Sequence, residues 1–154
     1  MIRPVPAVLA LASLASCYTV GGLYETRQVK VKVFDNTTER RTQEFDLTNA
    51  VVHEMTARGL RVNGPEAPVT LEGKIVDMRT PQVVSGDLNA VVVGAVSVRL
   101  QIRLVNTDGK EVWKDDTTQS ASYSTARGQT FDSARAETYD RLARWVVAHF
   151  EKEW

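Results

Sequence analysis

The sequence has 154 residues, of which 43% are hydrophobic and 25% are charged, a composition that is ordinary for one folded domain. It excludes a disordered or collagen-like chain and a protein with several membrane spans. The 19 basic residues balance the 19 acidic ones, so the chain lacks the basic excess that displaces counterions from nucleic-acid phosphates, and we expect no nucleic-acid partner.

The N-terminus has the features of an export signal. Arg3 and the amino group form a short positive region, and residues 7–15 form an apolar run. This run is shorter than the roughly 20 residues that span a bilayer. The small residues Ala15 and Ser16 then precede Cys17, the only cysteine. The pattern predicts a signal peptide over residues 1–16.

The segment Leu14-Ala15-Ser16-Cys17 is similar to a lipobox, the processing signal of bacterial lipoproteins. We interpret Cys17 as the lipidation site, with a diacylglycerol on its thiol and an acyl chain on its freed amino group, because stable anchoring needs more than one chain. We expect no other cofactor. An ordinary signal peptide with an incidental cysteine, or a buried structural cysteine, are the alternatives. Tyr18 is not aspartate, so inner-membrane retention is not signalled; we expect the periplasmic face of the outer membrane.

We expect residues 17–27 to form a short tether and residues 28–154 to form a single domain. Its first predicted element is a strand in which buried valines alternate with exposed lysines: Val29, Val31 and Val33 against Lys30 and Lys32. The residues from Asp35 to Thr38 are typical of turns and helix caps, and we expect them to end this strand.

The hydrophobic period changes to three and four residues between Gln43 and Arg58, which predicts a helix. Its apolar stripe consists of Leu47, Ala50, Val51 and Met55. Gly59 follows at the position where a left-handed residue commonly ends a helix.

Three more strands are predicted after this helix. The first runs from Val69 to Met78, and a long connection containing Pro81 and Gly86 follows it from Thr80 to Asn89. The next strand has the clearest alternation, with an apolar face made of Val96, Val98, Leu100, Ile102 and Leu104. A hairpin turn over residues 106–109 leads to a strand that extends to about residue 123.

A last helix is predicted from about Phe131 to Lys152, with a buried stripe of Tyr139, Leu142, Val146 and Phe150. The element order is therefore β-α-β-β-β-α. Hairpin-linked strands with two helices predict an α+β fold, an antiparallel-rich sheet of four strands with both helices packed on one face.

The sequence contains no pattern that is typical of an enzyme or a metal site. His53 and His149 lie on different predicted helices, without a histidine or cysteine at ligand spacing, and we expect both on the helix surface. Asp115 and Asp116 are neighbours on a strand, so they point to opposite faces and cannot act as an acid–base pair. We therefore expect a non-enzymatic protein without a metal.

Several segments, in their order along the chain, resemble the lipopolysaccharide-assembly lipoproteins of the LptE family. They are Cys17-Tyr18 with the lipobox and residues 29–37, 44–48, 69–76, 98–104, 109–113 and 120–123. The resemblance covers nearly the whole chain after Cys17. It implies an outer-membrane lipoprotein that sits as a plug inside a large β-barrel partner (LptD-like) and assists insertion of lipopolysaccharide into the outer leaflet.

Arg99 and Arg103 lie on the polar face of the clearest strand. We expect them to contact an anionic group of the glycolipid or of the barrel; ordinary solvated strand residues are the alternative. A second function also remains open, because outer-membrane lipoproteins that activate peptidoglycan synthases also begin with a strand and an Asn-x-Thr segment. Those proteins usually carry a long tether, whereas only about ten residues separate Cys17 from the first strand here, which favours a barrel partner close to the membrane.

Overall fold

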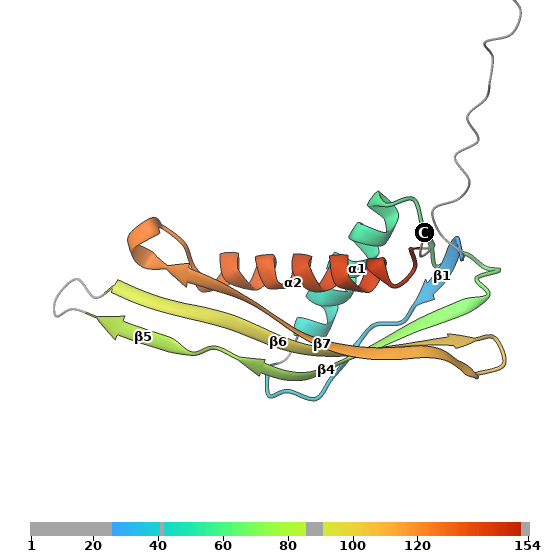
Figure 1. The fold of residues 1–154 in the computed structure, drawn as a ribbon, viewed down its shortest axis with the longest axis horizontal. Coiled ribbons are helices and arrows are strands. Elements are labelled where there is room, and N and C mark those ends of the chain that lie inside the picture. The colour runs from blue at the N-terminus through green and yellow to red at the C-terminus, as the bar shows by residue number, and fades with distance from the viewer. Residues whose placement is uncertain (1–25, 41, 86–90, 152–154) are drawn as a thin grey trace, which may run out of the picture.

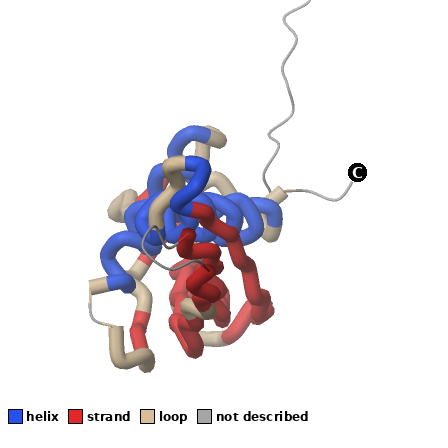
Figure 2. Tube along the Cα trace, turned by 90° about the vertical axis from the view of Figure 1, so that its left-hand side faces the viewer, coloured by secondary structure: helices blue, strands red, loops and turns tan. Residues whose placement is uncertain are grey.

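The computed structural model describes residues 26–40, 42–85 and 91–151. A long curved sheet forms one layer, and two helices cover one of its faces (Figure 1). Figure 2 shows the helices gathered on one side of the strands. The elements are β1 (Gln28–Val31), β2 (Asp35–Asn36), α1 (Gln43–Ala57), β3 (Arg61–Val62), β4 (Val69–Arg79), β5 (Gln82–Ser85), β6 (Val91–Asn106), β7 (Glu111–Ser124), the 3-10 turn η1 (Thr125–Arg127) and α2 (Phe131–Ala148).

The sheet is organised around β6. One edge of β6 pairs antiparallel with β7, and the other edge pairs antiparallel with β4 and then β5. Beyond β4 the pairing is parallel, because β1 and β2 run parallel to β4, and β3 runs parallel to β1. The α+β class and the helices on one face are as predicted, but the sheet formed by the described residues has seven strands and not four. The strands β2 and β3 were not predicted because two residues are too few to show a period of two.

The long connection predicted from Thr80 to Asn89 is wrong over its first half, where the chain forms the strand β5. The strand β5 continues the line of β4 along the same edge of β6. Between them, the Ala95 N–H donates to the Pro81 carbonyl at 3.0 Å. Pro81 has no N–H of its own, so it interrupts the ladder of hydrogen bonds without ending it. Residues 86–90, the rest of the predicted connection, lie outside the described residues.

The first strand is shorter than predicted, because β1 ends at Val31 and Val33 is 53% exposed. The chain bends after β1, and Phe34 takes the buried position in place of Val33. The Phe34 N–H donates to Thr48 Oγ1 of α1 at 3.0 Å, and its ring, 2% exposed, lies directly over Gly73 of β4. Phe34 and Gly73 thus form one packing unit that joins the start of the chain to the sheet.

The helix α1 confirms its prediction. Leu47, Val51 and Met55 are fully buried, and the helix ends beside Arg58. Gly59 adopts the left-handed conformation, with φ 87°. The chain then returns to the sheet as β3, which pairs with β1.

The helix α2 begins with a capping box formed by Thr130 and Ser133. Its predicted stripe is buried: Tyr139, Leu142, Val146 and Phe150. The helix ends at Ala148 and not near residue 152, which lies outside the described residues. Past that end, the chain places Phe150 edge-on against Trp113 of β7, with 5.7 Å between the ring centroids. No helix among the described residues is long and apolar enough to cross a membrane.

Candidate functional site

The sheet face that points away from the helices is polar. Residues that pair across β4, β6 and β7 form rows of charged and amide side chains on this face. The first two rows are Glu72–Arg103–Lys114 and Lys74–Gln101–Asp116. Basic and acidic side chains therefore lie within a few neighbouring positions of one another.

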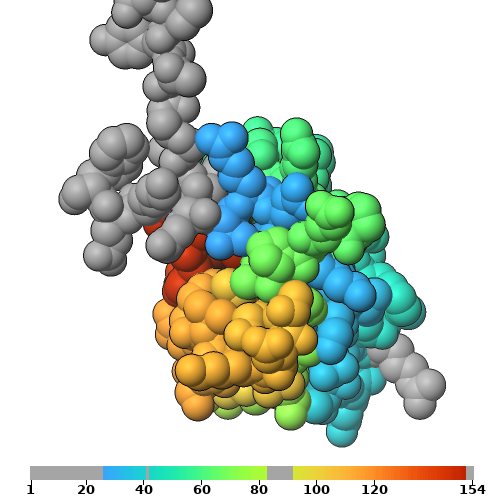
Figure 3. Space-filling model, turned by 90° about the vertical axis from the view of Figure 1, so that its right-hand side faces the viewer, coloured from blue at the N-terminus to red at the C-terminus, as the bar shows by residue number. Residues whose placement is uncertain are grey.

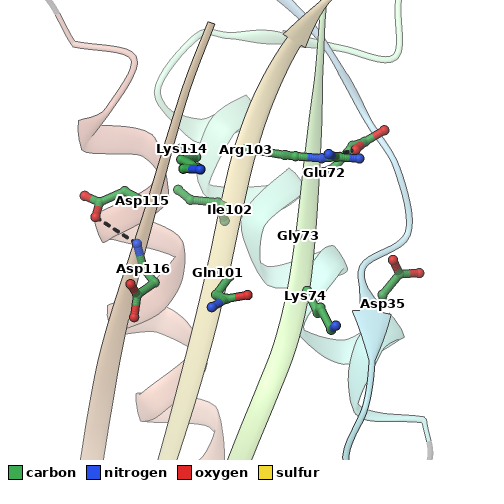
Figure 4. Close-up of a pocket in the computed structure, with 10 residues that line it drawn as sticks. All are labelled: Asp35, Glu72, Gly73, Lys74, Gln101, Ile102, Arg103, Lys114, Asp115 and Asp116. Carbon is green, nitrogen blue, oxygen red and sulfur yellow. Dashed lines mark hydrogen bonds and ion pairs between the residues drawn. The ribbon is translucent and has the colours of Figure 1, made fainter. Parts of the chain in front are cut away.

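These rows line a groove of about 470 Å³, which Asp35 of β2 borders on the far side of β4 (Figure 4). A smaller hollow of about 190 Å³ lies at the next rows of the same strands. Its lining is Asp77, Arg79, Ser97, Arg99 and Thr118. The groove and this hollow together make the polar face the candidate functional site, which we call the outer groove.

The two arginines expected at the site do lie on this face, but each one is paired with a carboxylate. The Arg103 Nε donates to Glu72 Oε2 at 2.6 Å, and Arg99 donates through Nε and Nη2 to Asp116 Oδ2 at 3.0 and 2.8 Å. Lys32 also bonds to the Glu72 carboxylate. The hydrogen bond from Lys32, and then that from Arg103, hold the pKa of Glu72 below its ordinary value. The arginine charges are thus compensated within the sheet.

Two lysines of the outer groove are less closely paired with carboxylates. Lys74 has no hydrogen bond or ion pair with any described residue, and the Lys114 Nζ lies 3.8 Å from the nearest carboxylate oxygen, on Glu111. Neither lysine was predicted as a site residue from the sequence. The alternation of β4 places Lys74 on the polar face, but the cross-strand register, which decides which cations meet carboxylates, has no signal in the sequence.

The carboxylates of Asp115 and Asp116 point to opposite faces, as predicted. Asp116 binds Arg99 on the outer groove, whereas Asp115 lies 2.9 Å from His149 of the helix layer. The hydrogen bond from His149 lowers the pKa of Asp115.

His53 is exposed, but the surface prediction for His149 is wrong, because its side chain is only 24% exposed and contacts β7. Cys17, the predicted lipidation site, lies outside the described residues. Within residues 26–40, 42–85 and 91–151, no three histidine, cysteine or acidic side chains gather so that they could hold a metal.

A sequence model of the lipopolysaccharide-assembly family, LptE, matches residues 26–149, which is most of the chain. The chain belongs to the LptE family. The match confirms the resemblance that the motifs suggested. No curated protein matches the sequence significantly.

Solved structures of other bacterial proteins share the fold. A protein of Xanthomonas campestris has a TM-score of 0.55 at 10% identity, with 85% of this chain and 84% of that chain covered. A putative lipoprotein of Caulobacter crescentus scores 0.53 at 14% identity, with 77% and 87% covered. A minor lipoprotein of Acinetobacter baumannii scores 0.52 at 11% identity, with 82% and 92% covered. At these identities the likeness concerns the fold alone. The family match, and not these structures, links the chain to lipopolysaccharide assembly.

Proposed function

We propose that this LptE-family protein is the lipoprotein subunit of an outer-membrane lipopolysaccharide translocon. The lipid chains on Cys17 anchor its N-terminus on the periplasmic face, and the domain sits inside a large β-barrel partner and assists insertion of the glycolipid into the outer leaflet. The observation that carries this proposal is the family match over residues 26–149. The protein acts by binding and not by catalysis.

The short tether supports a partner in the membrane itself. Residues 17–27 reach at most about 40 Å when fully extended, so the domain stays close to the bilayer that holds Cys17. A synthase of the peptidoglycan layer would need a longer reach. No observation in the fold or the outer groove favours the synthase-activator function, and we use it as the competing outcome of the test.

The outer groove is the surface that we assign to charged groups of the glycolipid or of the barrel interior. Lys74 is the primary contact, because it has no carboxylate partner among the described residues, and Lys114 is the next, because its ion pair with Glu111 spans 3.8 Å and is exposed. Arg99 and Arg103 are secondary contacts, because an incoming phosphate would share them with Asp116 and Glu72. This assignment refines the expectation from sequence, which named the arginines alone.

The partner is tested by purifying the full-length lipidated protein from its native membranes in detergent and identifying what comes with it. A β-barrel protein in equal amount is the expected result. Recovery of a peptidoglycan synthase without a barrel would replace the proposal. The same preparation tests the anchor: the intact mass should show the acyl chains on the mature protein, and Cys17→Ala should release the protein from the membrane.

The outer groove is tested by binding of lipopolysaccharide to the purified protein. The double substitution Lys74→Glu with Lys114→Glu should weaken binding about tenfold or more, since each reversed contact costs on the order of 1 kcal/mol. Arg144→Glu is the matched control, because Arg144 is an exposed cation on α2, on the helix side of the sheet. Equal loss in the control and the groove variant would refute the assignment of the groove.

A further inference from the structure

The end of the sheet at which the described chain begins is formed by three segments that are distant in sequence. The strand β1 pairs with β3, and the Arg61 N–H donates to the Arg27 carbonyl at 2.8 Å. The start of β4 pairs with β1 and with the end of β6, which leads into the β6–β7 hairpin. Figure 3 shows this end, where the start of the chain in blue, the loop after β3 in green and the hairpin in orange form one surface. We call residues 27–30, 61–68 and 106–110 the tether end, because residues 17–27 lead from it to Cys17.

Basic side chains predominate at the tether end. Four exposed basic side chains have neither a hydrogen bond nor an ion pair with a described residue: Arg27, Lys30, Arg61 and Lys110. The acidic residues of the same segments are Glu66 and Asp108, so four positive charges stand against two negative ones. The chain as a whole has no such excess, because its 19 basic and 19 acidic residues balance. The tether end is therefore a surface that attracts anions.

The charged residues that border the tether end are paired with one another. At the end of α1, Arg58 bonds to Glu54 at 3.0 Å and to Glu151 at 3.2 Å. On β7, Lys114 has Glu111 as its nearest carboxylate, at 3.8 Å. The basic residues without a described partner thus lie at the very end of the sheet, beside the point where the tether joins the domain.

The hairpin that carries Lys110 is held in shape by the side chain of Asn106. The Asn106 Oδ1 accepts the N–H of Asp108 at 3.0 Å and the N–H of Lys110 at 2.8 Å. Two backbone bonds close the same turn, from Gly109 to the Asn106 carbonyl and from the Asn106 N–H to the Lys110 carbonyl, each 3.0 Å long. A contact through this hairpin therefore costs little ordering of the backbone, because the turn is already formed.

The tether decides which anionic surface lies within reach. Residues 17–27 span at most about 40 Å between the domain and the proposed lipid anchor at Cys17. The strand β6 has 16 residues and is about 50 Å long, so the opposite end of the sheet lies further from Cys17 by about that distance. The tether end is therefore the part of the domain that meets the anchoring leaflet without the domain turning over. The headgroups of anionic phospholipids present a plane of negative charge, which matches several basic side chains spread over one surface.

We propose that the tether end contacts anionic phospholipid headgroups of the leaflet in which Cys17 is anchored, through Arg27, Arg61 and Lys110. The inference rests on the lipid anchor of the proposed function and goes beyond it, because the contact orients the domain at the membrane. Each basic residue close to an anionic leaflet adds to the attraction. The anchor holds the surface at a high effective concentration, so a contact that is too weak to bind by itself is still occupied.

The test uses the full-length lipidated protein in vesicles of phosphatidylcholine alone or of phosphatidylcholine with an equal part of phosphatidylglycerol. Cys17 is the only native cysteine and is acylated in this preparation, so one introduced cysteine can be labelled with a polarity-sensitive dye. Thr107→Cys places the dye at the tether end, and Ala126→Cys in η1 is the control at the opposite end; both positions are exposed. We expect the dye at position 107 to report headgroup contact on the anionic vesicles and water on the neutral ones. The dye at position 126 should report water on both, and about 1 M salt, where the screening length is roughly 3 Å, should release the contact.

Charge reversal identifies the residues that make the contact. Arg61→Glu with Lys110→Glu should lower the ratio of docked to undocked domain about tenfold or more on the anionic vesicles. Arg127→Glu with Arg144→Glu is the matched control, because it reverses two exposed basic residues of η1 and α2. Anchored protein whose dye at position 107 stays in water, or reports the same contact on neutral vesicles or in the charge-reversed variant, would refute this inference alone. Protein that washes off the neutral vesicles would refute the lipid anchor, and this inference with it.

Discussion

Gly73→Ala tests the packing unit that joins the start of the chain to the sheet. A Cβ at Gly73 would lie 2.6, 2.7 and 2.8 Å from Cδ1, Cγ and Cδ2 of the Phe34 ring. Such contacts are far inside van der Waals distance, and the Cγ atom cannot swing away like the end of a flexible chain. Because Phe34 is 2% exposed and its N–H is fixed to Thr48, the ring has no free space to move into.

The magnitude follows from two opposing effects. Overpacking a filled core costs about 1–3 kcal/mol. Replacing glycine by alanine stabilises by about 0.4–1 kcal/mol, because it restricts the unfolded chain. We therefore expect Gly73→Ala to lower the free energy of unfolding by about 1–2 kcal/mol, which corresponds to a fall in Tm of about 3–8 °C for a domain of this size.

The assay is chemical and thermal unfolding followed by circular dichroism, with Phe34→Ala and the double variant completing a mutant cycle. Phe34→Ala alone should cost about 3–5 kcal/mol. In that background the ring is gone, so Gly73→Ala should be neutral or stabilising. If Gly73→Ala costs the same in both backgrounds, or costs nothing in the native background, the reasoning from close packing is wrong.

Predictions at three further residues concern stability and pH. Thr130→Ala removes the capping box of α2 and should cost about 1 kcal/mol in chemical unfolding, whereas Thr130→Asn should retain most of it. Tyr139→Phe leaves Gln43 Oε1 without its 2.6 Å bond and should cost about 1–3 kcal/mol. Burial raises the pKa of Tyr139 to about 12, so an absorbance titration should show its ionisation delayed, and the protein should lose stability as pH rises from about 10 towards 12. The lowered pKa of Asp115 has the opposite sign: its contribution is present above about pH 4 and is lost as pH falls below it, so the Tm difference between the native protein and Asp115→Asn should shrink in acid.

Elements whose hydrophobic pattern runs over many residues could be predicted, because such a pattern is local in the sequence. The stripe of α1 and the alternation along β6 each span many residues, and a single register satisfies every apolar side chain in them. The short strands β2, β3 and β5 could not be predicted, since their existence depends on a neighbour that is distant in sequence. The same reason explains why Phe34 is buried and Val33 is exposed. The bend after β1 and the space over Gly73, which has no side chain, decide which of the two is buried.

Part of the candidate site could likewise be predicted from the sequence, and part could not. The polar face, with Arg99 and Arg103 on it, could be predicted from the sequence, because alternation fixes the face of every residue in a strand. The sequence also carried the family motifs and the lipobox around Cys17, which remains a prediction. The pairing of the two arginines with Asp116 and Glu72 depends on the register between strands, which the sequence does not show. The same register leaves Lys74 without a carboxylate partner among the described residues and Lys114 with only a 3.8 Å ion pair to Glu111, while the packing of α2 on β7 brings His149 to Asp115. Hydrogen bonds and ion pairs act over a few ångströms, so they depend on register and packing, which form only when distant segments meet.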